Sequence, residues 1–145
     1  MHHMKRALTL LLATGFVLSH VAIAQADETI KNPATGTPEH TIAMAFSAAI
    51  AKDYARYLDT VHPEHRDTEK QRRERERYEW SRFLKQYRWY LSSDAPVTFA
   101  IASRREEGKD SMRVFLRDQK NKERMPVPVR MKRHQGQWKI VVSSL

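Results

Sequence analysis

Two histidines, a glutamate and an aspartate lie close together near the middle of the chain. His62, Glu64 and His65 are separated by one or no intervening residues, and Asp67 follows shortly after. Imidazole and carboxylate groups bind zinc and similar ions, but a metal site needs a rigid scaffold on which the ligands converge. Pro63 and the charged flanking residues instead indicate a solvated turn between two helices. We therefore predict neither a bound metal nor a cofactor.

Basic and apolar residues alternate on three segments in the last third of the chain. A period of two indicates β-strands with one buried face, so the basic residues share the opposite face. That face carries no acidic residue on the three strands, so its positive charges reinforce one another. It is either a solvated surface that discourages aggregation or a docking surface for an acidic protein, an anionic lipid headgroup or an envelope polymer. Its basic residues are Arg113, Arg117, Arg130, Lys132 and Lys139.

Two helical segments precede these strands. Apolar residues from Ile42 to Val61 recur at three and four positions, which predicts one helix that starts at Thr37-Pro38. A second helix is predicted over residues 67–91. Its Glu/Arg-rich first half is expected to project into solvent, and its aromatic second half to lie on the sheet.

The Glu/Arg-rich stretch has almost balanced charge. Residues 64–77 contain six basic and five acidic side chains. Such a run is typical of a solvated helix face rather than of a polyanion-binding segment. We therefore do not expect nucleic acid as a partner.

Four segments with a period of two follow the helices. The last two, joined by a polar turn at residues 134–137, predict a hairpin, and Trp138, Ile140 and Val142 are expected on its buried face. Consecutive strands of this kind predict an antiparallel meander, and helices packed on it give the fold class α+β. The four predicted strands span residues 97–101, 112–116, 127–131 and 138–142.

The N-terminus has the layout of a cleaved secretory signal peptide. Lys5 and Arg6 precede an apolar stretch from Ala7 to Leu18, and small residues at positions 22, 24 and 26 form cleavage motifs. The stretch is shorter than the ~20 residues that span a bilayer, and an uncleaved anchor is the alternative. The chain has no cysteine, hence no disulfide and no thiol for a lipid anchor. We expect a periplasmic or secreted protein.

The chain thus divides into three parts. Residues 1–26 are the predicted signal peptide, and residues 27–37 are a flexible lead-in because they contain Asn, Pro and Gly without a period. Residues 38–145 are expected to form a single α+β domain with one core.

Two motifs in this domain resemble exported members of the nuclear-transport-factor-two-like superfamily. They are Ala51-Lys52-Asp53-Tyr54 near the end of the first helix and Gly136-Gln137-Trp138-Lys139-Ile140 at the last hairpin. The resemblance covers residues 38–145 and implies a cystatin-like α+β roll, related in shape to ketosteroid isomerases and polyketide cyclases. The Glu/Arg-rich helical half departs from the pattern. Related rolls often dimerise through the sheet, so the resemblance makes a homodimer a candidate.

The implied roll has a cavity between its helices and its sheet. Asp53 and Tyr57 are the best candidates there for a base and a proton donor, since ketosteroid isomerases use an aspartate and a tyrosine on an enolate. Their positions do not match that enzyme residue by residue, so no catalytic residue is carried over. A set of aromatic residues either lines a ligand pocket or fills the core. These are Phe46, Tyr54, Tyr57, Trp80, Phe83, Tyr87 and Trp138.

Three functions are compatible with these features. We favour a non-catalytic, exported binding or interaction module of the cell envelope. The alternatives are a small-molecule isomerase or lyase that uses the cavity, and an envelope protein that meets anionic lipid or polymer through its basic surface. A fold resemblance alone does not separate them.

Processing of the exported chain tests the signal-peptide prediction. We expect the mature protein to begin at Asp27, or at Gln25 as the second choice, because both follow a small-x-small motif. N-terminal sequencing of the exported protein measures this directly. Recovery of residues 4–20 in that protein would contradict the prediction.

Overall fold

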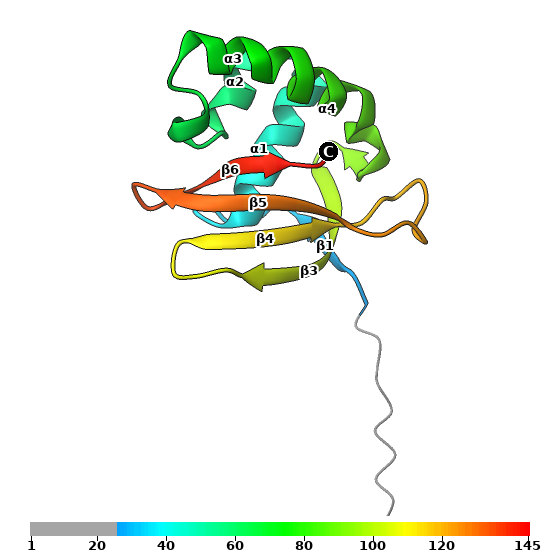
Figure 1. The fold of residues 1–145 in the computed structure, drawn as a ribbon. Coiled ribbons are helices and arrows are strands. Elements are labelled where there is room, and N and C mark those ends of the chain that lie inside the picture. The colour runs from blue at the N-terminus through cyan, green and yellow to red at the C-terminus, as the bar shows by residue number, and fades with distance from the viewer. Residues whose placement is uncertain (1–25) are drawn as a thin grey trace, which may run out of the picture.

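Helices pack against a curved antiparallel sheet in the computed structural model, which describes residues 26–145. The α+β class predicted from the sequence is confirmed. The sheet has six strands, with neighbours in the order β1-β3-β4-β5-β6 and β2 paired to β3 (Figure 1). Their bounds are β1 Glu28–Lys31, β2 Leu91–Asp94, β3 Val97–Glu106, β4 Ser111–Leu116, β5 Val127–His134 and β6 Gln137–Ser143.

Strands β3 to β6 form the antiparallel meander that the alternating residues predict. β1 and β2 are additional strands that the sequence did not predict. β1 lies within residues 27–37 and pairs with β3, from Glu28 opposite Ile101 to Lys31 opposite Thr98. Its single buried residue is Ile30, so the strand is too short to show a period.

The first predicted helix is two helices, α1 (Pro38–Ala51) and α2 (Tyr54–Asp59). Thr37 caps α1, as its position before Pro38 predicts. Lys52 then ends α1 in the left-handed region, with a φ of 53°, and the Asp53 side chain caps α2. The apolar spacing continues almost unchanged across these two residues, which is why the prediction of one helix was wrong.

The second helical segment is continuous. It passes from α3 (Glu69–Arg75) through a π-helical turn (Glu76–Trp80) into α4 (Ser81–Gln86). Thr68 and Gln71 form a capping box that starts it. A short 3₁₀ turn at Tyr87–Trp89 then leads into β2.

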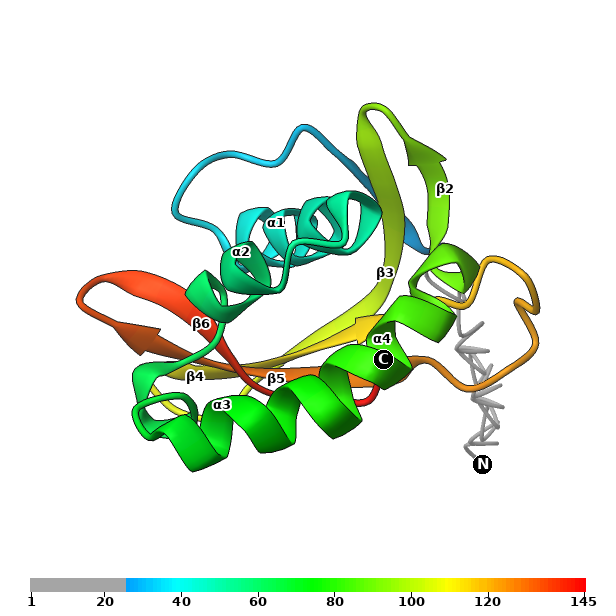
Figure 2. The same cartoon turned by 90° about the horizontal axis from the view of Figure 1, so that it is seen from above.

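The two helical layers take different places on the sheet. α1 and α2 lie on its concave side, whereas α3 and α4 run along the edge formed by β6 (Figure 2). The chain after α2 covers that edge, because Ile140 donates its N–H to the Thr60 carbonyl at 2.7 Å and accepts from the His62 N–H at 2.8 Å. Arg82 on α4 also binds the Ser143 and Leu145 carbonyls, each at 2.9 Å. The Glu/Arg-rich half exposes most of its side chains, as predicted, but it contributes buried Arg75 to this contact and so does not project freely into solvent.

A β-bulge in β6 changes which residues are buried. Trp138 and Ile140 face the core, as predicted. The pairing with β5 shifts between Arg130 and Met131, so Val142 lies opposite Arg130 and is 46% exposed. Val141 is buried instead. The expectation that Val142 is buried was therefore wrong, because one extra residue in a strand reverses the faces beyond it.

The predicted signal peptide falls on residues outside the described part of the chain, apart from Ala26. Within residues 26–145, no helix combines the length and the apolar character needed to cross a membrane.

Two substitutions on β6 test the bulge. Ile140→Ala should lower the free energy of unfolding by about 2–5 kcal/mol, because it removes a buried branched side chain. Val142→Ala should cost under about 1 kcal/mol, since the side chain is largely exposed. Denaturant unfolding of both variants measures the difference. Equal losses would contradict the bulged register.

Candidate functional site

Three arginines form a row across the outer face of the sheet, the face turned away from α1. Arg105 on β3 lies opposite Arg113 on β4, and Arg113 lies opposite Arg130 on β5. Arg105 and Arg130 are exposed, and Arg113 is half-buried. Neighbouring strands are about 4.8 Å apart, so the three residues form a short positive line perpendicular to the strands. We call these three residues the arginine row.

Acidic side chains neutralise little of the arginine row. Glu107 Oε1 lies 2.7 Å from Arg113 Nε, whereas neither Arg105 nor Arg130 forms an ion pair with another residue in the range 26–145. The Arg105 guanidinium lies instead over the Phe115 ring, 5.8 Å from its centroid. Like charges directly opposite each other destabilise a sheet, so fold stability does not account for the row.

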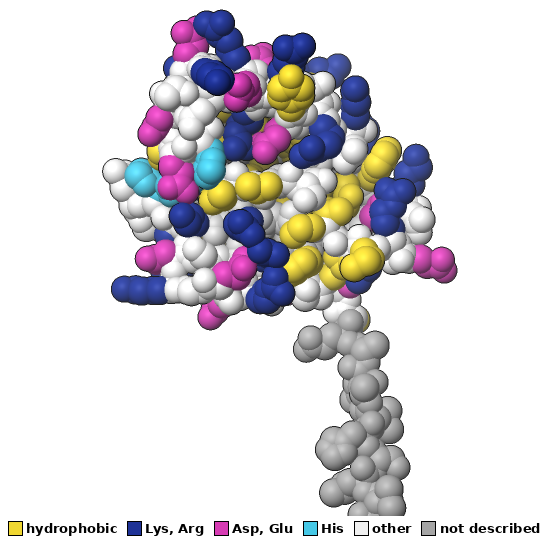
Figure 3. Space-filling model, viewed as in Figure 1, with side chains coloured by type: hydrophobic (Ala, Val, Ile, Leu, Met, Phe, Trp, Pro, Cys, Tyr) yellow, Lys and Arg dark blue, Asp and Glu magenta, His cyan; other side chains and the backbone are white. Residues whose placement is uncertain are grey.

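Apolar residues border the row. Val142 continues it onto β6, opposite Arg130. Phe115 and Pro128 lie opposite each other, two residues further along β4 and β5, and both are half-buried. Basic and hydrophobic side chains gather together on the front of the molecule in Figure 3. The outer face therefore offers positive charge beside apolar surface.

Two other residues of the predicted basic face have acidic partners. Arg117 holds Asp27 with two contacts, Nε to Oδ2 at 2.8 Å and Nη2 to Oδ1 at 3.2 Å. Lys132 Nζ lies 3.2 Å from Glu64 Oε1. These acids come from the segment before β1 and from the loop after α2. These acidic partners make the outer face less uniformly positive than the residues on its strands alone suggest.

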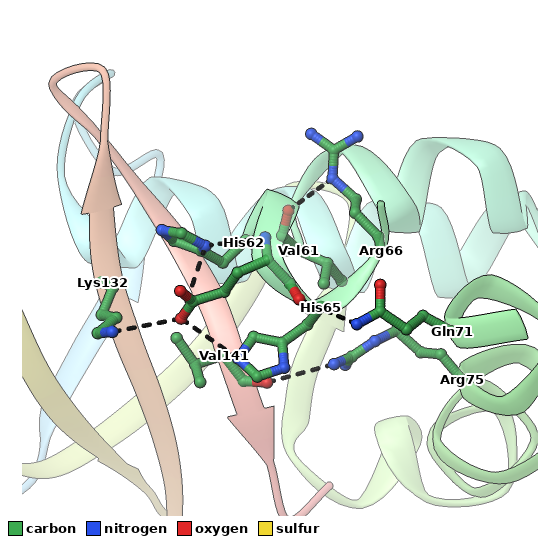
Figure 4. Close-up of polar contacts among 9 residues, drawn as sticks. Val61, His62, His65, Arg66, Gln71, Arg75, Lys132 and Val141 are labelled. Atoms are coloured by element: carbon green, nitrogen blue, oxygen red, sulfur yellow. Dashed lines mark hydrogen bonds and ion pairs between the residues drawn. The ribbon is translucent and has the colours of Figure 1, made fainter. Parts of the chain in front are cut away.

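The contacts of Glu64 hold the loop His62–Arg66 in place (Figure 4). Its Oε1 lies 3.4 Å from His65 Nε2 and 3.9 Å from His62 Nδ1, and it also meets Lys132. The hydrogen bond from Lys132 lowers the pKa of the Glu64 carboxyl, and burial lowers the pKa of His62. Among residues 26–145, no group of three or more His, Cys, Asp or Glu side chains is arranged to hold a metal ion. The arrangement attaches the loop to β5.

The aromatic residues predicted as pocket or core pack mainly against one another. The Tyr57 and Trp80 ring centroids are 4.9 Å apart, and Phe83 lies 5.6 Å from Tyr57. Six of these residues are at most 6% exposed: Phe46, Tyr57, Trp80, Phe83, Tyr87 and Trp138. Tyr54 lies beside this cluster, 5.6 Å from Trp80, and is partly exposed. Trp138 belongs to the same core and lies under the Arg133 guanidinium, 4.7 Å from the ring centroid.

The residues considered for proton chemistry have structural contacts. Asp53 Oδ1 accepts the Arg56 N–H at 3.1 Å and so caps α2. The Tyr54 hydroxyl donates to the Arg72 carbonyl. Burial raises the pKa of Tyr54 and of Tyr57 to about 12, so both hydroxyls stay protonated at neutral pH.

A buried ion pair joins α3 to the sheet edge. Arg75 is 9% exposed, pairs with Glu79 and donates from Nη2 to the Val141 carbonyl at 3.3 Å. Burial raises the pKa of the Glu79 carboxyl, although Arg75 opposes this shift. Arg75 Nε is buried without a hydrogen-bond partner among the described residues. Sequence reasoning missed this pair, because nothing in an alternating Glu/Arg run marks which arginine is buried.

A small cavity of about 190 Å³ lies between α1, the end of α2 and β6. Trp138 and Met44 supply apolar surface, and His40 and Lys139 supply polar groups. Lys139 Nζ donates to the Asp59 carbonyl at 2.6 Å, and burial lowers its pKa. This last member of the predicted basic face is therefore directed to the end of α2.

Comparison of the chain with protein-family models, curated proteins and solved structures found no match.

Removal of one partner from the buried pair tests its role. Glu79→Ala should lower the free energy of unfolding by about 3–5 kcal/mol, because it leaves the Arg75 charge buried and uncompensated. The double variant Arg75→Met/Glu79→Leu should lose less, since no buried charge remains. Denaturant unfolding compares the two variants.

Arg73→Ala, which breaks the exposed pair with Glu69, is the control and should cost at most about 1 kcal/mol. A double variant less stable than Glu79→Ala would contradict this account.

Proposed function

We propose that this protein is an exported, non-catalytic binding module of the cell envelope, built on a nuclear-transport-factor-two-like roll, that holds an anionic partner on the outer face of its sheet. The arginine row carries the proposal. Its members lie directly opposite one another on adjacent strands, with Glu107 as their one acidic partner in the described range.

The energetics of the row support a binding role. Two adjacent like charges on a sheet face repel, and an anion placed between them replaces that repulsion by attraction. The exposed residues Arg105 and Arg130 are free of ion pairs within residues 26–145, so an anion need not break an ion pair to bind them. Guanidinium groups also suit carboxylates and phosphates because they donate two parallel hydrogen bonds.

The interior supports a non-catalytic role. Aromatic rings occupy the space between α1, α4 and the sheet, as the contacts of Phe46 with Phe83 and Phe99 illustrate. Asp53 is used as a helix cap. A base and a donor facing a substrate cavity would be needed for the isomerase alternative.

The N-terminal sequence supports export to the periplasm or the exterior. In that compartment the partner is an acidic protein, an anionic lipid or an acidic polymer. Cleavage after Ala26 removes Lys5 and Arg6, so the formal net charge falls from +9 to +7, and this basic balance favours any of the three.

Charge reversal on the outer face tests this proposal. The exported protein is mixed with envelope fractions of its own host at low and at physiological salt, and co-sedimentation is measured. Wild-type binding should weaken steeply with salt, because exposed charges are screened beyond ~8 Å at physiological ionic strength. Arg113→Glu/Arg130→Glu should abolish binding and retain the wild-type circular dichroism spectrum.

The matched control reverses two exposed charges elsewhere. Arg56→Glu/Lys85→Glu changes the net charge by the same amount on α2 and α4 and should bind nearly as well as the wild type. If the Arg113/Arg130 variant bound as well as the wild type at low salt, the outer face would be a solvated surface and the proposal would fail.

A further inference from the structure

The direction of the arginine row does not suit a partner that is itself a β-strand. A strand added to a sheet lies parallel to its neighbours and pairs at an edge. The row instead crosses β3, β4 and β5 at right angles, with one guanidinium per strand and about 4.8 Å between strands. A linear polymer with one anionic group per repeat, and a repeat close to the strand spacing, matches this geometry.

A second row lies beside the first. Ser103, Phe115 and Pro128 occupy successive strands in register, two residues from the arginines and therefore about 6.8 Å away. The Phe115 ring lies under the Arg105 guanidinium and is half-buried. The face thus carries a line of cations parallel to a line with a hydroxyl, an aromatic ring and a proline ring.

Resting on the proposed function, we infer that the partner is an acidic polysaccharide of the uronic-acid type, with its chain lying across the strands. Each sugar of such a chain has one carboxylate on its edge and C–H groups on its ring face. The carboxylates meet the arginine row, and the ring faces lie on Pro128 and beside the Phe115 ring, one side of which already faces the Arg105 guanidinium. The hydroxyl groups reach Ser103, which is exposed.

Competing anions fit this face less well. A bilayer surface favours large apolar side chains that enter the interface. Of the large hydrophobic residues exposed within residues 26–145, Val142 borders the arginine row, whereas Met44, Tyr78 and Met125 lie on α1, the π-helical turn and the loop after β4. A peptide made of acidic residues alone lacks the flat C–H surface that a sugar ring offers to Phe115.

The choice of arginine over lysine adds a chemical argument. Each guanidinium has a fixed fork that grips a carboxylate through two N–H donors, whereas a lysine ammonium is a point charge. The lysine on the same face of β5, Lys132, is paired with Glu64. Arginine therefore supplies the cations that remain available to the partner.

Binding of defined polymers to the full chain tests the inference. Titration calorimetry with polygalacturonate oligomers should show binding, and neutral dextran should show none. Poly-glutamate and phosphatidylglycerol vesicles should bind at least about tenfold more weakly than the uronate oligomers at the same salt, because they use charge alone.

Two conservative variants separate geometry from charge. Arg113→Lys/Arg130→Lys keeps the charge and should weaken uronate binding about tenfold, because the forked contacts are lost. Phe115→Leu keeps an apolar side chain and should weaken uronate binding several-fold, with poly-glutamate binding unchanged. Thermal melts confirm that each variant is folded. Lys85→Arg, on α4, is the matched control and should bind as the wild type does.

The outcomes distinguish this inference from the proposed function. If poly-glutamate or the vesicles bind as tightly as uronate oligomers, or if Phe115→Leu weakens all of them equally, the polysaccharide inference is wrong and an anionic-partner module remains. If no polyanion binds and the Arg113→Glu/Arg130→Glu variant still associates with envelope fractions, both are wrong.

Discussion

The buried pair of Arg75 and Glu79 is the contact on which the arrangement of helices and sheet depends. It places a charged stretch of helix against the last strand, where Arg75 also binds the Val141 carbonyl. Removing charges from water is costly, and this cost is offset only when both partners stay in place. The pair therefore fixes how the α3–α4 segment sits along β6, while Arg82 fastens its other half to the chain end.

The edge that Arg75 contacts is also the place where β6 has its bulge, and the bulge affects the outer face. The bulge lies where Arg75 meets the strand, and beyond it Val141 is buried whereas Val142 is exposed. Val142 then lies opposite Arg130 and ends the arginine row with an apolar residue. In a regular β6, Val142 would lie opposite Val129 on the core side and Val141 would lie opposite Arg130, so the bulge exchanges the places of the two valines. The bulge thus leaves Val141 buried at the strand edge that Arg75 contacts and Val142 on the outer face.

The sequence predicted the parts of the fold that depend on regular periods. The meander and both helical segments follow from apolar spacing, because burial of one face requires it. The break at Lys52 depends on one backbone conformation, and the burial of Arg75 on tertiary contacts, so neither leaves a period. For the site, alternation placed Arg113 and Arg130 on one face. It missed Arg105, because β3 extends past the predicted end at residue 101. It also missed the acids Asp27, Glu64 and Glu107, which reach the face from other segments.

Those acids divide the basic residues into two groups with different roles. Arg117 holds Asp27 next to β1, and Lys132 holds Glu64 in the loop after α2, so each ties a separate segment to the sheet. Such contacts occupy the cation and stabilise local structure. Arg105 and Arg130 form no ion pair with another segment within the described range. They lie on either side of Arg113, where the like charges repel one another. A charge that costs stability and fastens nothing in its own chain is therefore the basis on which we propose a partner outside it, and the in-line spacing of the three strands sets the repeat that the proposed partner has to match.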